Sequence, residues 1–134
     1  MTCAASEGLE KLADLVIGLA TGPEILTGST RLKAGSATKA ALNAITTTAM
    51  VRLGKTYGNL MVDLRPGSAK LRDRARRIIE AAAEVSSDEA DALYLAADED
   101  VKVAILMARL EVSASAARQR LKAADGHLRR ALSG

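Results

Sequence analysis

The sequence has few of the residues that build disulfides, metal sites and aromatic cores. Its 134 residues include one cysteine, one histidine, two prolines and two tyrosines, with no tryptophan and no phenylalanine. A single cysteine excludes an internal disulfide and a site made of several thiolates. The lone histidine, His127, has no serine or cysteine near it with a carboxylate to complete a triad. We therefore expect neither a metal site nor a catalytic triad.

The sequence also has no recognisable targeting segment and no membrane span. No basic stretch followed by an apolar run stands at the N-terminus, and the longest apolar runs are far shorter than the roughly twenty residues that a span needs. One isolated thiol fits a reducing compartment. These features predict a soluble, cytoplasmic protein that has no membrane partner.

Small and aliphatic side chains are abundant. Hydrophobic residues make up 49% of the chain although aromatic residues are only 1%. Alanine, leucine, valine and isoleucine without large rings favour closely packed helices over a sheet sandwich. The length suits one domain, or one small domain with an appended half. We predict a mainly α fold.

Charge is nearly balanced, with 19 basic against 16 acidic residues and a net charge of +3. Such a balance does not argue for a nucleic-acid partner. The densest basic cluster is interrupted by Asp73 and Glu80 and contains no aromatic residue for base stacking; its members are Arg65, Lys70, Arg72, Arg74, Arg76 and Arg77. We interpret this cluster as a solvated helix face and predict no binding to nucleic acid.

The second half of the chain has the pattern of a small helical bundle. The clearest break is Arg65-Pro66-Gly67-Ser68, so we place a boundary between residues 1–65 and 66–134. Helix starts follow Ser68, Ser86 or Ser87, and Ser113 or Ser115. Apolar spacing predicts that these helices extend to about residues 85, 97 and 124, with a further helix over about 99–111 and a last turn at 128–132. The helix over 99–111 is the most apolar, and we expect it at the centre.

A long helix is expected over residues 30–53. Its second half, from Ala40 to Leu53, is apolar nearly all round, and a helix of that kind is buried on every side. In so short a chain this predicts an interface between two copies as much as an internal core. The branched residues Thr46, Thr47 and Thr48 lower the helix propensity, so packing must hold this part.

Residues 14–20 allow two interpretations. Apolar positions from Leu9 to Leu19 fit one helical face, but Asp14 to Thr21 also has the composition of a short buried strand that ends in a Gly-Pro turn. A strand needs partners, and no other segment offers a convincing parallel strand. We therefore expect at most one short strand near residues 14–20.

The polar stretch from Thr21 to Lys39 is the best candidate for a ligand site. Hydroxyls and two cations gather where the long helix is expected to begin, at Thr27, Ser29, Thr30, Arg31 and Lys33. Amide donors, hydroxyls and cations at a helix N-terminus are groups that bind a phosphate ester. Alternatively, Ser29 or Thr30 is an ordinary N-cap and the cations are solvated. Spacing alone does not decide between the two.

A family resemblance adds to this interpretation. The stretch Gly22-Pro-Glu-Ile-Leu-Thr-Gly-Ser-Thr-Arg-Leu-Lys-Ala-Gly-Ser-Ala-Thr-Lys39 resembles the signature shared by bacterial N-acetylmuramic acid 6-phosphate etherases and the glucokinase regulatory protein. The similarity continues through residues 42–71 and, more loosely, to about Leu132, and the etherases are the closer relatives. A departure is Pro66-Gly67-Ser68, where the relatives usually carry an asparagine.

The resemblance implies a fold and a site. Residues 1–65 would end a sugar isomerase (SIS) domain, with the long helix at a homodimer interface, and residues 66–134 would resemble ubiquitin-associated bundles. A phosphosugar would bind at this interface. Carried over by position, the binding residues are Glu24, Ser29, Thr30, Arg31 and Lys33. Glu24 would accept hydrogen bonds from sugar hydroxyls, whereas the two cations would face the phosphate.

The resemblance also implies an activity. The etherases eliminate D-lactate from N-acetylmuramic acid 6-phosphate and give N-acetylglucosamine 6-phosphate, with no metal or cofactor. Their two acid/base glutamates lie upstream of the matched segment, so no catalytic residue is expected in this chain. Three hypotheses stay open: a C-terminal portion of the lyase that is inactive alone, a stand-alone phosphosugar-binding regulatory module, and a structural dimerisation module.

Overall fold

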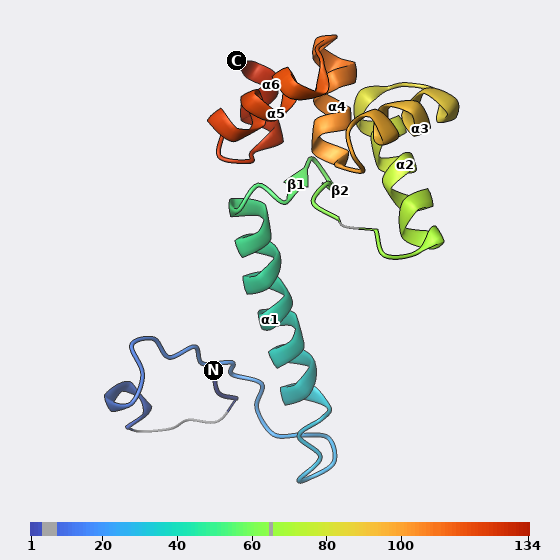
Figure 1. The fold of residues 1–134 in the computed structure, drawn as a ribbon. Helices are drawn as coiled ribbons and strands as arrows, with labels where there is room; N and C mark the ends of the chain where they lie inside the picture. The colour runs from blue at the N-terminus through green and yellow to red at the C-terminus, as the bar shows by residue number, and fades with distance from the viewer. Residues whose placement is uncertain (4–7, 65) are drawn as a thin grey trace. The chain divides into compact units, whose positions relative to one another are not determined.

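The computed structural model describes residues 1–3, 8–64 and 66–134 (Figure 1). Within these ranges six α-helices and one two-stranded hairpin confirm the predicted mainly helical class. The elements are η1 (Leu9–Lys11), α1 (Lys33–Arg52), β1 (Thr56–Tyr57), β2 (Leu60–Met61), α2 (Ala69–Ala83), α3 (Ser87–Ala96), α4 (Val101–Leu110), α5 (Ala114–Ala123) and α6 (Leu128–Ser133).

The chain divides into two compact units, Met1–Ala49 and Met50–Gly134. The predicted domain boundary falls at Arg65, which lies outside the described residues. The domain limits 1–65 and 66–134 therefore stay a prediction. In the described ranges, no helix combines the length and the apolar content needed to cross a bilayer.

The first unit has little regular structure before α1. Within residues 14–20, Gly18 forms an isolated parallel bridge with Thr2, in which the Thr2 N–H donates to the Ile17 carbonyl at 3.0 Å. The expectation of at most one short strand, near residues 14–20, is wrong, because both strands of the described chain lie at residues 56–61. Residues 14–20 make no β-pairing beyond this single bridge, so they do not form a strand of a sheet.

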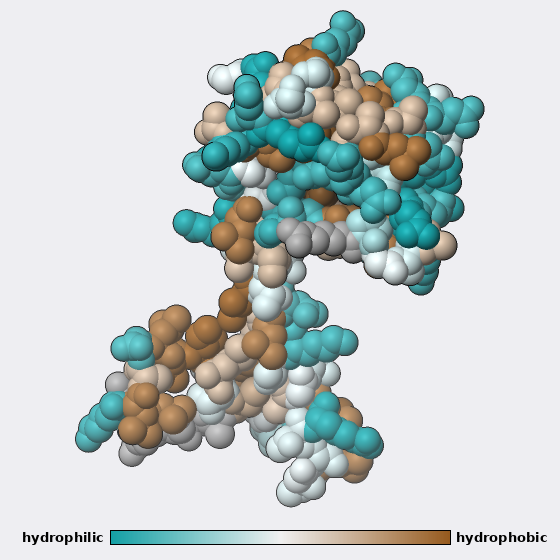
Figure 2. Space-filling view, viewed as in Figure 1, coloured by the Kyte–Doolittle hydropathy of each residue, from teal (hydrophilic) through white to brown (hydrophobic). Residues whose placement is uncertain are grey.

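Helix α1 begins three residues later than predicted and ends at Arg52, just before Gly54, which has a φ of 69°. Among the described residues of α1 none is buried, and Leu42 and Ile45 are 48% and 47% exposed. Apolar side chains accordingly appear on the surface over α1 (Figure 2). Burial of this helix against a second copy stays a prediction. Thr46 donates to the Leu42 carbonyl at 2.8 Å, the usual back-bond of a helical threonine.

The hairpin that follows α1 was not predicted. Strands β1 and β2 are antiparallel, with Thr56 opposite Met61 and Tyr57 opposite Leu60, and Gly58 at the turn has a φ of 58°. Glycine adopts this backbone conformation without strain. The chain then enters the bundle core through Val62 and Leu64, both buried.

Helices α2 to α6 form the predicted bundle. Four of them are N-capped by a side chain that accepts from the N–H three residues on; the caps are Ser68, Ser86, Asp100 and Ser113. The structure thus selects Ser86 over Ser87 and Ser113 over Ser115. These oxygens satisfy amides that a helix start leaves without a carbonyl partner.

Helix α4 lies at the centre of the bundle, as predicted, because α2, α3, α5 and α6 all pack against it. Every residue from Val101 to Leu106 is buried. The buried hydrophobic residues of the described chain all belong to the second unit: Val62, Leu64, Ala75, Ile78, Ile79, Ala82, Ala83, Ala90, Tyr94, Ala97, Val101, Val103, Ala104, Ile105, Leu106, Ala117, Leu128 and Ala131. Among the described residues of the first unit, none is a buried hydrophobic residue.

Candidate functional site

The polar stretch from Thr21 to Lys39 contains a loop that Glu24 closes by binding the start of α1. One carboxylate oxygen, Oε2, accepts from the backbone N–H of Lys33, and the other, Oε1, accepts from that of Ala34, each at 2.9 Å. These amides belong to the first turn of α1, where N–H groups lack a helical partner. Glu24 therefore takes the capping role that the sequence allowed for Ser29 or Thr30.

Further bonds hold the loop. The Lys33 ammonium donates to the Pro23 carbonyl at 2.8 Å, which ties the start of α1 to the residue before Glu24. At the other end, the Gly35 N–H donates to the Thr30 carbonyl at 2.8 Å. Gly28 has a φ of 85°, a conformation that favours glycine, and it allows the chain to reverse. The loop between Glu24 and Lys33 is therefore a closed, hydrogen-bonded structure.

The electrostatics of Glu24 agree with this geometry. The hydrogen bonds from the Ala34 and Lys33 amides, helped by the Lys33 charge, lower the pKa of the Glu24 carboxyl below its ordinary value of 4.5. An ionised carboxylate at the N-terminus of a helix is also favoured by the helix dipole. Glu24 is thus a carboxylate at neutral pH, and each of its oxygens already has a backbone donor.

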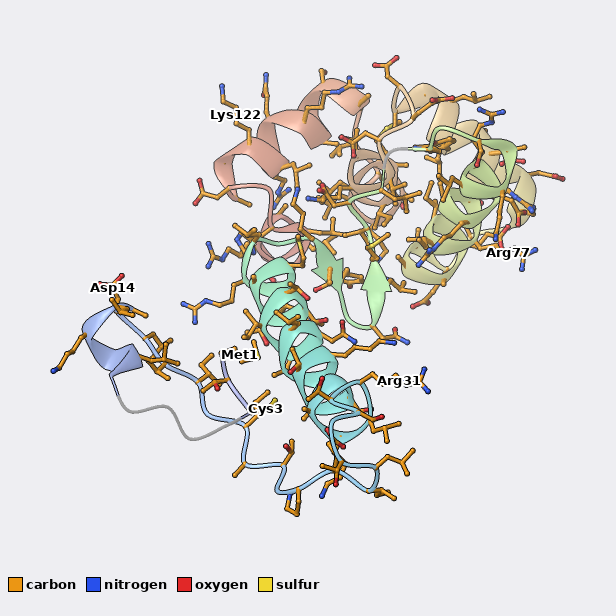
Figure 3. All side chains as sticks on the ribbon, turned by 90° about the horizontal axis from the view of Figure 1, so that it is seen from below. Met1, Cys3, Asp14, Arg31, Arg77 and Lys122 are labelled. Carbon is orange, nitrogen blue, oxygen red and sulfur yellow. The ribbon has the colours of Figure 1, made fainter. Side chains whose placement is uncertain are left out.

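The other predicted site residues are placed differently. Arg31 is exposed and extends away from the loop into solvent (Figure 3). Ser29 is half-buried and Thr30 is exposed. Throughout the described residues, none of these three side chains has a hydrogen bond or ion pair. The structure therefore brings Glu24 and Lys33 together through the loop closure, and leaves the hydroxyls and the guanidinium available.

A groove of about 490 Å³ runs along α1 beside Thr30; its lining is Thr30, Ala34, Gly35, Thr38, Lys39, Leu42 and Asn43. Gly35 packs closely on the loop, because a Cβ there would lie 3.3 Å from the Thr30 carbonyl oxygen. No carboxylate or imidazole belongs to this lining. The groove therefore offers hydroxyl, amide and ammonium groups for binding, and no carboxylate or imidazole to act as a general acid or base.

Thr38, Lys39 and Asn43 were not among the predicted binding residues. The available signal was helical spacing, because Gly35, Lys39 and Asn43 are four residues apart and so share a helix face. Elsewhere in the described part of the chain, no group of three or more histidine, cysteine, aspartate or glutamate residues could hold a metal ion.

In comparison with known proteins, the chain spans only 39 to 43% of the length of the curated relatives described here. These relatives are N-acetylmuramic acid 6-phosphate etherases, to which the chain is homologous. The enzyme of Streptomyces avermitilis is 48% identical over 132 residues, or 98% of this chain and 42% of the relative.

Two further relatives give the same result. The etherase of Rubrobacter xylanophilus is 51% identical over 98% of this chain and 43% of its own length, and that of Deinococcus radiodurans is 51% identical over 89% of this chain and 39% of its own length. No family model matches the chain. The resemblance expected from the motif is confirmed as homology to part of the etherase.

Proposed function

We propose that this chain is the C-terminal portion of a cytoplasmic lyase that cleaves the D-lactyl ether of N-acetylmuramic acid 6-phosphate, and that it is inactive without the rest of the enzyme. The observation that carries the proposal is identity of 48% with an etherase across 98% of this chain, which is only 42% of that relative. So uniform a match favours a contiguous piece of the enzyme over a purpose-built regulator.

The chemistry divides between the two portions. Elimination of lactate needs a base to remove the proton next to the carbonyl and an acid to protonate the departing oxygen. The groove beside Thr30 has no carboxylate or imidazole for these two roles. This chain would therefore bind the substrate, with Arg31 facing the phosphate and the hydroxyls of Ser29 and Thr30 donating to its oxygens, and the other portion would supply the acid and base.

A complementation assay tests the proposal. The segment of the Rubrobacter xylanophilus etherase that this chain does not match is produced separately and mixed with this chain, and D-lactate release from N-acetylmuramic acid 6-phosphate is measured. Release is expected from the mixture and from neither part alone. The intact relative serves as the positive control. A mixture that forms a stable complex and releases no lactate would contradict the proposal.

A second candidate is a stand-alone phosphosugar-binding module, with regulation or dimerisation as its role. It is favoured by the closed loop and the groove, which residues of the first unit form by themselves. Calorimetric titration of the isolated chain with N-acetylglucosamine 6-phosphate decides this point. Heat that saturates supports the module, whereas no heat at millimolar ligand would eliminate it.

A further inference from the structure

We infer that Glu24 is a positioning residue of the phosphosugar site, which closes the loop carrying Ser29, Thr30 and Arg31, and is not a group that contacts the sugar. The identity of the ligand as a phosphosugar rests on the proposed function, whereas the positioning role of Glu24 rests on the loop geometry. It changes the part that the resemblance implied for this glutamate.

Both carboxylate oxygens of Glu24 are already bound to the backbone. Each oxygen of Glu24 accepts one backbone N–H at 2.9 Å, from Lys33 and from Ala34. A sugar hydroxyl would have to use the remaining lone pair of an oxygen that a helix start already holds, and this helix start needs the carboxylate as the acceptor for its amides. The same two amides are equally engaged, so they are not free to bind a phosphate. Anion recognition therefore passes to side chains of the loop.

The closure by Glu24 restrains the segment that carries most of the predicted ligand residues. Residues 25–32 lie between the two ends that Glu24 joins, and three of the predicted ligand residues are among them. Lys33 repeats the tie through the Pro23 carbonyl, and Gly35 anchors the Thr30 carbonyl to the helix. Without the carboxylate, a segment containing Gly28 gains backbone freedom that binding must remove again. Loss of Glu24 should therefore weaken the binding of any ligand that contacts the loop, whether or not that ligand contains a sugar ring.

The first experiment observes the closure directly in the full chain without ligand. Amide resonances of Lys33 and Ala34 are followed by NMR in wild type, Glu24→Gln and Glu24→Ala, with Asp14→Asn as a matched control, because Asp14 is an exposed carboxylate of the same unit. Both resonances are expected to shift in the Glu24 variants and to stay in place in the control. Unchanged resonances in Glu24→Ala would overturn the closure.

The second experiment separates positioning from direct contact. Dissociation constants of inorganic phosphate and of N-acetylglucosamine 6-phosphate are measured for the same four proteins. In Glu24→Ala the dissociation constants of both ligands are expected to rise by about fivefold, the typical effect of a lost helix cap. The ratio of the two constants is expected to stay unchanged. A loss confined to the phosphosugar would overturn the inference, because it would mean that Glu24 contacts the sugar.

The two experiments also distinguish a failure of the inference from a failure of the proposed function. If wild-type protein binds neither ligand, alone or with the complementary etherase segment, the proposed function fails, and the ligand part of the inference fails with it. The amide resonances still decide whether Glu24 closes the loop. If both ligands bind and Glu24→Ala leaves both affinities unchanged, the positioning role alone is wrong.

Discussion

At the scale of single residues, the most consequential contact of the second unit is a buried lysine. Lys102 is 7% exposed, and its ammonium pairs with Asp63 at 2.8 Å and donates to the Gly126 carbonyl at 3.1 Å. Asp63 also pairs with Lys55. A charge removed from water is stable only when it is paired and hydrogen-bonded, so this carboxylate holds α4 to the segment after the hairpin.

Asp63→Asn should therefore destabilise the protein, because it leaves the Lys102 ammonium without an anion. We expect the free energy of unfolding to fall by roughly 1–3 kcal/mol, measured by urea denaturation. Lys55→Met is the matched control, since its side chain is 40% exposed and an exposed pair contributes less than about 1 kcal/mol. Equal effects of the two substitutions would contradict this view of Lys102.

The same carboxylate predicts a dependence on pH. Burial raises the pKa of Asp63, but the hydrogen bonds and charges of Lys102 and Lys55 outweigh it, and the net pKa is lowered from 3.8. A lowered pKa in the folded state gives stability that is full above pH 3.8 and is lost as pH falls through the folded pKa. Urea denaturation between pH 6 and pH 2.5 should show a shallower acid loss in Asp63→Asn. Parallel profiles for the two proteins would refute this.

At the scale of elements, the end of α1 depends on one close approach. Gly54 is buried with a φ of 69°, and a Cβ there would lie 2.9 Å from Cγ and Nδ1 of the His127 ring and 3.2 Å from the Gly126 carbonyl oxygen. The turn after α1 can thus pack on the turn before α6 only because residue 54 is a glycine, which has no Cβ.

Gly54→Ala should be clearly more destabilising than Gly58→Ala. Both glycines have positive φ, so each substitution costs about 1 kcal/mol of backbone strain. At Gly58 nothing lies within 4 Å of the added Cβ, whereas at Gly54 the His127 ring must move, which adds about 1–3 kcal/mol. Thermal unfolding of the two variants measures the difference. Similar melting temperatures would show that the ring gives way freely.

The exposed face of α1 gives a prediction about assembly. If two copies pair through this helix, Leu42→Glu should convert a dimer into a monomer, because a carboxylate would be buried in an apolar interface. Thr47→Glu is the matched control, since Thr47 is five positions on, about 140° around the helix. Light scattering after size exclusion gives the mass. A wild-type monomer at high concentration would eliminate the homodimer.

The elements also show which features a sequence can reveal. The bundle helices could be predicted because each cap lies next to the amides that it satisfies, as Ser68 does for Leu71. The start of α1 could not, because its cap, Glu24, lies nine residues before Lys33, and rules based on local spacing do not reach that far. The hairpin was missed because two-residue strands are too short to show a period, although the buried Val62 and Leu64 stand on either side of the polar Asp63.

At the scale of the whole molecule, the two units differ in what holds them. All buried hydrophobic residues of the described chain lie between Val62 and Ala131, in the second unit. A helix such as α1, with no buried side chain, has little stability in water beyond its own propensity. The candidate site therefore lies on the unit whose described residues include no buried hydrophobic side chain, and hydrogen bonds hold its loop.

A fragment of residues 50–134 should consequently fold alone. We expect its urea unfolding transition to be cooperative, with a midpoint close to that of the full chain, followed by circular dichroism at 222 nm. Residues 1–49 expressed alone should give only weak helical signal. The prediction is wrong if the longer fragment loses its cooperative transition, since that would mean that the first unit contributes to the core.

The exposed apolar residues of the first unit also bear on the lifetime of the chain in a cell. Leu12, Ile25 and Leu42 are 84%, 84% and 48% exposed, and such surfaces are what chaperones and proteases recognise. A chain of this kind is protected from degradation to the extent that a binding partner covers its apolar surface. Its abundance should follow the supply of its binding partner more closely than the rate of its own synthesis.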